Sequence, residues 1–157
     1  MILQKKIIKF LLIVLLISLN SCGFQRVNNT FTERFAVKEI TFSGDSRIGN
    51  ILKNLILQNS KKESINLITI DLSINKKKEI KEKNITNKVT KYLIGIAVKA
   101  KISQAGKKEI NYTFNKSTYL VVGDKNSQTK LKEIQLLDDL TNSVAEELTR
   151  SLNIKYK

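Results

Sequence analysis

Residues 89–103, VTKYLIGIAVKAKIS, determine which fold the rest of the chain can adopt. Large apolar side chains recur here at every second position, the spacing of one face of a β-strand; they are Tyr92, Ile94, Ile96, Val98, Ala100 and Ile102. In the middle of the stretch the other face is apolar too, at Leu93, Gly95 and Ala97. A strand that is apolar on both sides is typically covered on both sides. The sequence therefore predicts a central strand here.

The neighbouring segments supply the partners of this strand. Residues 104–107, QAGK, predict the turn of a hairpin that leads to a strand at about 108–122. Upstream, residues 68–74 alternate apolar and polar side chains and predict another strand, and residues 34–42 predict the first one. The lysine-rich stretch 76–87 is expected to be a charged connection between strands.

Two stretches have the three- and four-residue spacing of an amphipathic helix. The first is expected to begin at a capping Asp45 or Ser46 and to end near Asn59; its apolar face comprises Ile48, Ile51, Leu52, Leu55 and Ile56. The second has roughly 24 residues; its apolar stripe comprises Leu131, Ile134, Leu137, Leu140, Val144, Leu148 and Leu152.

These elements follow one another in the order β-α-β-β-β-α. The simplest arrangement is an α+β fold, a four-stranded, mostly antiparallel sheet with both helices on one face. The other face of such a sheet remains open. Either a partner covers it, or the twisted sheet covers it with its own side chains, and the apolar middle of 89–103 favours a partner.

The amino terminus has the parts of a secretion signal. Residues 1–9 are basic, and residues 10–19, FLLIVLLISL, form an apolar run. This run is shorter than the about 18 residues that a membrane-spanning helix needs. Residues 19–22, LNSC, resemble the lipobox of bacterial lipoproteins, whose cysteine is lipidated and becomes the mature amino terminus. We expect 1–21 to be a lipoprotein signal peptide and 22–157 a single periplasmic domain anchored through Cys22; an ordinary signal peptide with a chance cysteine is the alternative.

The composition leaves little room for catalysis. The chain has no His and only one Cys, which excludes His-assisted nucleophiles, His/Cys zinc sites and an internal disulfide. Asp138–Asp139 and Glu146–Glu147 are adjacent pairs, and neighbours on a helix point about 100° apart. We therefore expect no enzyme activity, no catalytic residue, no metal and no cofactor.

Positive charge is the strongest compositional signal. The net charge is +14, which a coding bias toward Lys, Ile and Asn can also produce. Locally, residues 76–91 hold seven lysines against two glutamates. Such a stretch predicts a diffuse anion site, with a solvated loop as the alternative. Export and the lack of interleaved aromatic residues argue against nucleic acid and favour a phosphorylated lipid.

Several motifs together resemble a known family. They are the anchor CGF at 22–24, the strand KYLIGIAVKAKI at 91–102, the glycine turn at Gly106, KSTYLV at 116–121 and DDLTNSVAEELTRSL at 138–152. In this combination the chain resembles the LPS-assembly lipoprotein family, LptE, over nearly the whole mature chain.

The resemblance implies a role without catalysis. It implies an outer-membrane lipoprotein on the periplasmic side that plugs and stabilises the LPS-assembly β-barrel (LptD-like) and binds lipopolysaccharide during its export. Gly23 after the anchor cysteine, in place of the Asp of inner-membrane retention, agrees with the outer membrane. The regions that match the family's lipopolysaccharide contacts hold Lys81, Lys83, Lys125 and Lys130, and the lysine-rich stretch adds Lys78 as a fifth expected contact. A stand-alone periplasmic lipoprotein that binds an acidic ligand or inhibits another envelope protein is the competing interpretation.

The lipobox gives the first test. Mass spectrometry of the membrane-extracted protein is expected to show an amino terminus at Cys22 that carries diacylglycerol and a fatty acyl chain. Cys22→Ser should leave the signal peptide uncleaved. An unmodified thiol at residue 22, or cleavage at another bond, would contradict the lipoprotein assignment.

Overall fold

A four-stranded sheet and two helices make up the part of the chain that the computed structural model describes, residues 34–157. The elements are β1 (Ala36–Gly44), α2 (Ser46–Gln58), β2 (Leu67–Lys83), β3 (Val89–Ser103), β4 (Ile110–Val121) and α3 (Asn126–Lys155). The predicted order β-α-β-β-β-α is confirmed. The predicted signal peptide and Cys22 lie outside the described residues.

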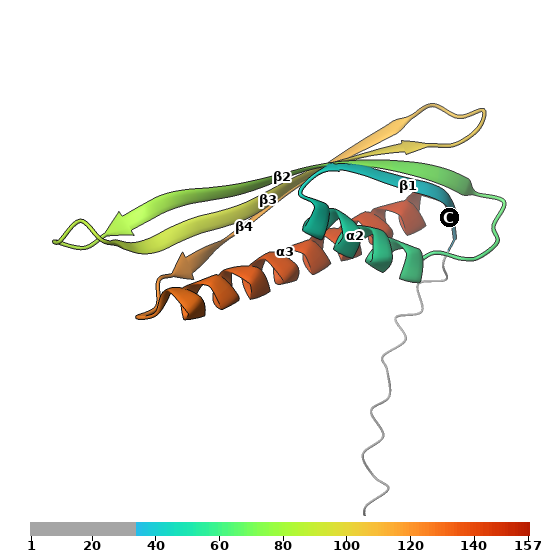
Figure 1. Cartoon of the computed structure of the whole chain (residues 1–157). Helices are drawn as coiled ribbons and strands as arrows, with labels where there is room; N and C mark the ends of the chain where they lie inside the picture. Colours follow the sequence, from blue (N-terminus) through green and yellow to red (C-terminus); the bar gives the residue numbers. More distant parts are fainter. Residues whose placement is uncertain (1–33) are drawn as a thin grey trace, which may run out of the picture. The chain divides into compact units, whose positions relative to one another are not determined.

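The strands lie in the order in which they occur in the chain, β1-β2-β3-β4. β1 runs parallel to β2, and the β2–β3 and β3–β4 pairs are antiparallel. The parallel pair follows from α2, which carries the chain back between β1 and β2. Both helices lie on the same side of the sheet (Figure 1), as the sequence predicts. The fold is α+β with a mixed, mostly antiparallel sheet.

The core lies between this face of the sheet and the two helices. Alternate residues contribute buried side chains from Ile68 to Ile74 in β2 and from Ile94 to Ile102 in β3, and each helix contributes one apolar stripe. The fully buried residues include Ile68, Ile70, Ile94, Val98, Ile102, Leu52, Ile56, Val144, Leu148 and Leu152. The predicted inner face of β3 is confirmed, with Tyr92 at its partly buried end.

β2 is much longer than the sequence predicts. Residues 76–83, expected in a charged connection, continue the strand and pair with β3 from Lys76↔Ile96 to Lys83↔Val89. The first half of β3 has backbone groups that need a partner, and this pairing outweighs the weak strand preference of lysine. The connection shrinks to a turn in which the Asn84 side chain accepts from the backbone N–H groups of Thr86 and Lys88.

The remaining boundaries differ less. β1 begins two residues after the predicted 34–42 and extends to Gly44, whose φ is +99°. A Cβ at this position would lie 1.9 Å from the carbonyl oxygen of Ile74, so glycine is required where β1 approaches β2. α3 has 30 residues because its first turns, Asn126–Lys130, are helical although they carry no apolar stripe.

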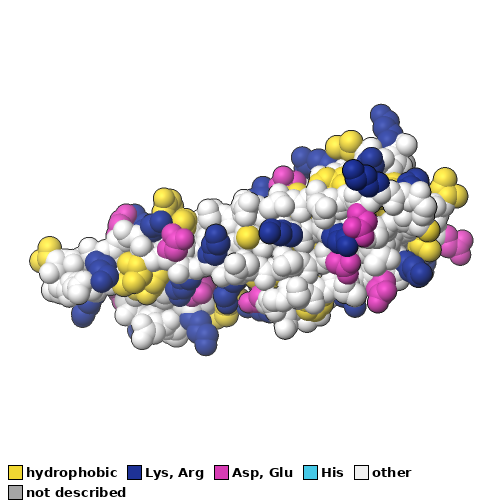
Figure 2. Space-filling view, turned by 90° about the horizontal axis from the view of Figure 1, so that it is seen from above, with side chains coloured by type: hydrophobic (Ala, Val, Ile, Leu, Met, Phe, Trp, Pro, Cys, Tyr) yellow, Lys and Arg dark blue, Asp and Glu magenta, His cyan; other side chains and the backbone are white. Residues whose placement is uncertain are grey.

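The sheet face opposite the helices is mainly polar. Figure 2 shows this face with Lys or Arg side chains, several Asp or Glu side chains and a few apolar ones scattered among other side chains and backbone. Its register brings Ser73, Lys99 and Thr113 into one row and Asn75, Ala97 and Asn115 into the next. The apolar middle of β3 lies at the floor of a shallow hollow of about 250 Å³ that Lys77 and Glu79 border. Polar neighbours thus partly cover the apolar middle of β3.

Gly95 forms the floor of this hollow. A Cβ at residue 95 would lie 2.8 Å from the carbonyl oxygen of Lys116 and 3.1 Å from the Cβ of Ser117. Glycine therefore lets β4 approach β3 closely here.

The two faces of β3 are expected to respond differently to the same substitution. Ile96 is 2% exposed under the helices, so Ile96→Lys buries an unpaired charge and should lower the unfolding free energy by about 3–5 kcal/mol. Ala97 is half-buried on the open face, where Ala97→Lys should change it by less than about 1 kcal/mol. Urea unfolding followed by circular dichroism measures both, and an equal loss would contradict the one-sided helix cover.

Candidate anion-binding surface

The predicted lysines gather at one end of the sheet. Residues 76–91, here called the basic hairpin, form the outer parts of β2 and β3 and the turn between them. In Figure 1 this hairpin extends past α2, with the end of β4 and the start of α3 beside it. The hairpin lysines therefore belong to the same end of the fold as Lys125 and Lys130, which lie at the start of α3.

Lys78 is held against α3. Its Nζ lies 2.6 Å from a carboxylate oxygen of Glu133 and 4.5 Å from the centre of the Tyr92 ring. The ion pair neutralises most of this charge, and the ring contact adds a cation–π interaction. Lys78 therefore attaches the basic hairpin to α3 and has little charge left for a ligand.

Lys81 and Lys83 are exposed on the hairpin. Lys81 donates to Glu79 at 2.9 Å, and this hydrogen bond raises the pKa of Lys81 and lowers the pKa of Glu79. Lys83 donates to the Asn87 side-chain oxygen at 3.0 Å, a neutral partner. An exposed pair such as Lys81–Glu79 exchanges readily for a phosphate because it is worth only about 0–1 kcal/mol.

Other hairpin lysines divide in the same way. Lys91 is paired with Glu82 and lies 5.8 Å from the centre of the Tyr119 ring. Lys77 and Lys88 make no ion pair with any residue in the described range 34–157. The uncompensated charge of the hairpin is thus carried by Lys77, Lys83 and Lys88, of which the sequence singled out Lys83.

Lys125 and Lys130, at the start of α3, lie in different surroundings. Lys125 is the residue before the helix, and its carbonyl accepts from the Thr129 backbone N–H at 3.2 Å. Lys130 lines a groove of about 340 Å³ between the start of α2 and α3, together with Lys76 and the Arg47–Asp138 ion pair. The five predicted lysines therefore share one end of the fold without converging on a single pocket.

Apolar side chains accompany the lysines at this end. Ile80, Ile85, Tyr119, Val121 and Leu131 are all exposed, Ile85 completely. The sequence analysis missed the first four because it treated 76–87 as a charged connection and 119–121 as ordinary strand. It placed Leu131 on the apolar stripe of the second helix, whereas Leu131 is 68% exposed. The two isoleucines among the charged residues of 78–85, Ile80 and Ile85, are the signal that could have revealed the apolar part of the hairpin. Together the lysines and these residues form an amphipathic surface.

The described residues contain no side-chain cluster that could bind a metal ion and no helix that could span a membrane. No group of three or more Asp, Glu, His or Cys side chains within 34–157 is placed to hold a metal ion. Neither described helix has the length and hydropathy needed to span a membrane. What this surface offers chemically is ammonium groups beside apolar carbon.

The fold is shared with solved bacterial lipoproteins. An uncharacterized lipoprotein B from Nitrosomonas europaea matches with a TM-score of 0.59 and 17% identity, over 83% of this chain and 90% of that chain. The rare lipoprotein B from Shewanella oneidensis gives 0.56 and 14%, over 74% and 95%. A minor lipoprotein from Acinetobacter baumannii gives 0.56 and 12%, over 77% and 94%.

These likenesses define the class of fold. At such identities they show that the chain has the βαβββα fold of these lipoproteins. No protein-family model matches the chain, and no curated protein matches it. The fold implied by the family resemblance is therefore found in bacterial lipoproteins of the rare lipoprotein B type.

Asp45 connects the basic hairpin to α2 and yields a pH-dependent prediction. Of the two caps that the sequence allows, the structure uses Asp45. Its side chain accepts from the Ile48 backbone N–H at 3.1 Å, and its other oxygen lies 3.5 Å from Lys76 Nζ. The hydrogen bond from Ile48 and the charge of Lys76 lower the pKa of Asp45 below 3.8. The ionised Asp45 carboxylate therefore stabilises the folded protein above pH 3.8. This stabilisation is lost as the pH falls through the pKa that Asp45 has in the folded state.

Asp45→Ala is expected to lower the unfolding free energy at neutral pH by about 1 kcal/mol, because the helix loses its cap. Asp45→Asn keeps a side-chain acceptor but cannot ionise. At pH 7 Asp45→Asn should therefore lose less stability than Asp45→Ala. Below pH 4 its stability should fall less steeply with pH than that of the parent protein. Thermal melts across this range measure both effects; identical pH profiles of parent and Asp45→Asn would contradict the role of the carboxylate.

Proposed function

We propose that this chain is a non-enzymatic outer-membrane lipoprotein that plugs and stabilises an LPS-assembly β-barrel and binds lipopolysaccharide during export. The fold shared with bacterial lipoproteins supports an envelope lipoprotein. The lipobox at 19–22 and the family motifs support the more specific role.

The amphipathic surface at the basic hairpin is the observation that carries the lipopolysaccharide part. Lipopolysaccharide presents phosphates next to acyl chains, so a binding surface needs cations beside apolar groups. Lys83 and Lys88 lie on the same hairpin as the exposed Ile80 and Ile85, and Tyr119 lies beside Lys91. Lysine serves this purpose as a flexible point charge that can follow phosphates in several positions.

The polar character of the open sheet face supports the proposal that the protein sits inside a β-barrel. The interior of an outer-membrane barrel is polar, whereas its lipid-facing exterior is apolar. The rows of Ser, Thr, Asn and Lys on this face match a polar lumen (Figure 2). The hollow over Gly95 and Ala97 would accept a side chain that projects from the barrel wall.

One purification tests both parts. The full chain with a carboxyl-terminal affinity tag is produced in its own host, extracted in mild detergent and analysed by native mass spectrometry. We expect a complex of this chain with one large β-barrel, and lipopolysaccharide bound to the purified chain. Recovery of the chain without a barrel would contradict the plug and favour a stand-alone lipoprotein.

Two matched double variants distinguish the effect of the hairpin lysines on lipopolysaccharide binding from the effect of the net charge of the protein. Lys81→Gln with Lys83→Gln should weaken lipopolysaccharide binding about two- to tenfold at low salt and less at high salt, because both contacts are exposed. Lys38→Gln with Lys99→Gln removes the same charge from exposed positions elsewhere and should bind like the parent. Equal affinities of the two double variants would show that the hairpin is only a solvated element.

A further inference from the structure

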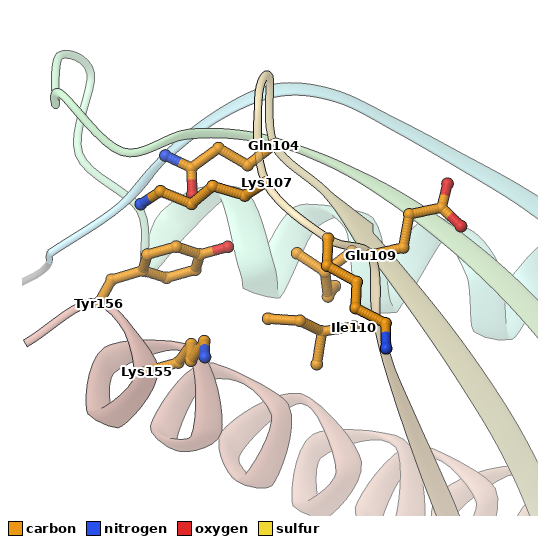
Figure 3. Close-up of a pocket in the computed structure, with 8 residues that line it drawn as sticks. Gln104, Lys107, Glu109, Ile110, Lys155 and Tyr156 are labelled. Carbon is orange, nitrogen blue, oxygen red and sulfur yellow. The ribbon is translucent and has the colours of Figure 1, made fainter.

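A cavity lies at the opposite end of β3 from the basic hairpin. It has a volume of about 400 Å³ and opens between the β3–β4 turn and the carboxyl end of α3 (Figure 3). Ile102, Ile110 and Tyr156 form its apolar walls. Ile102 is fully buried and Tyr156 is 8% exposed, so both walls are fixed by the core. Such walls suit the carbon part of a ligand.

The polar lining of this cavity is strongly positive. Lys107 and Lys108 come from the β3–β4 turn, and Lys155 comes from the last turn of α3. The Nζ of Lys107 lies 6.0 Å from the centre of the Tyr156 ring, within reach of the opening. In Figure 3, Lys107 and Lys155 lie on opposite sides of that ring. The carboxyl end of α3 contributes roughly half a negative charge through the helix dipole. The three lysines outweigh it, so the cavity keeps a net positive charge.

The single carboxylate among the lining residues is already bonded. Glu109 lies 2.9 Å from Lys101 Nζ and accepts from the Ser103 hydroxyl at 3.3 Å. Figure 3 shows its carboxylate directed away from Tyr156. The three lysines make no ion pair with any residue in the described part of the chain. Their charge is therefore available to an anion.

Gln104 adds an unused acceptor. Its side-chain oxygen is buried and accepts no hydrogen bond from the described residues. A buried acceptor without a donor is unfavourable, and proteins usually satisfy it with a partner. Lysine donors are within the same lining, but a hydroxyl group of a ligand would satisfy it without displacing their charges.

We infer that this cavity binds a polyol phosphate ester such as a glycerol phosphate group, either free or as a lipid headgroup. Lys107 and Lys155 hold the phosphate, a ligand hydroxyl donates to the Gln104 oxygen, and the carbon atoms pack against Tyr156. A carboxylate is the less suitable anion because its planar pair of oxygens is matched best by arginine, and the lining contains none.

Calorimetry on the full chain in a non-ionic detergent tests this inference. Glycerol 3-phosphate and lysophosphatidylglycerol are titrated separately. Binding of both compounds, or of glycerol 3-phosphate alone, supports the site and shows that it accepts a free polyol phosphate. Binding of lysophosphatidylglycerol alone supports the site with a lipid source. Binding of neither overturns the inference.

Variants assign the binding to the cavity. Lys107→Gln with Lys155→Gln should raise the dissociation constant about tenfold or more, since two charge-assisted contacts are lost. The control Lys38→Gln with Lys99→Gln removes the same charge outside the cavity and should stay within about twofold of the parent. If both double variants bind equally, the cavity is not the site.

Two further measurements test the ligand chemistry. Gln104→Leu should weaken glycerol 3-phosphate binding but leave inorganic phosphate binding unchanged, because only the ester brings an alcohol hydroxyl beside its phosphate. Glycerate, which has a carboxylate in place of the phosphorylated CH2OH group, should bind at least about tenfold more weakly than glycerol 3-phosphate. Glycerate that binds as tightly as glycerol 3-phosphate would overturn the phosphate assignment.

Discussion

The pairing of β3 with β2 on one side and β4 on the other is the interaction on which the rest of the structure depends. β3 contributes Ile94, Ile96 and Val98 to the core while its backbone is bonded along both edges. Each such side chain stabilises the fold by about 1.5–3 kcal/mol on burial. The apolar stripes of α2 and α3 are buried against each other and against the sheet that this pairing assembles, α2 over β1 and β2 and α3 over β3 and β4.

The same pairing creates the candidate lipopolysaccharide surface. Because β2 follows β3 as far as Lys83, the hairpin extends beyond the cover of α2, and its apolar residues Ile80 and Ile85 stay exposed. Their lysine neighbours are only partly neutralised by Glu79, Glu82 and Glu133. Exposed apolar side chains such as these are unfavourable in water unless a ligand or partner covers them. This is the physical basis of the proposed function.

Both ends of β3 therefore carry positive charge of different character. At the hairpin, the lysines lie on an open surface with exposed apolar side chains, which suits a large amphiphile. At the carboxyl end of α3, Lys107 and Lys155 border a cavity with buried walls at Ile102 and Tyr156, which suits a small group. The sheet in between presents rows of polar side chains that suit a polar environment.

The sequence by itself determined the fold class, the element order and the inner face of β3, and it narrowed the cap of α2 to Asp45 or Ser46, because periodicity and capping are local properties. It pointed to the hairpin lysines but missed the exposed Ile85 and the cavity at Gln104. The length of β2 was decided only in the tertiary structure, where the backbone of β3 needs partners that Lys76–Lys83 supply despite their weak strand preference. Likewise, the sequence cannot show that Lys78 is neutralised by Glu133, since packing of α3 on the sheet brings these residues together across 55 positions of the chain.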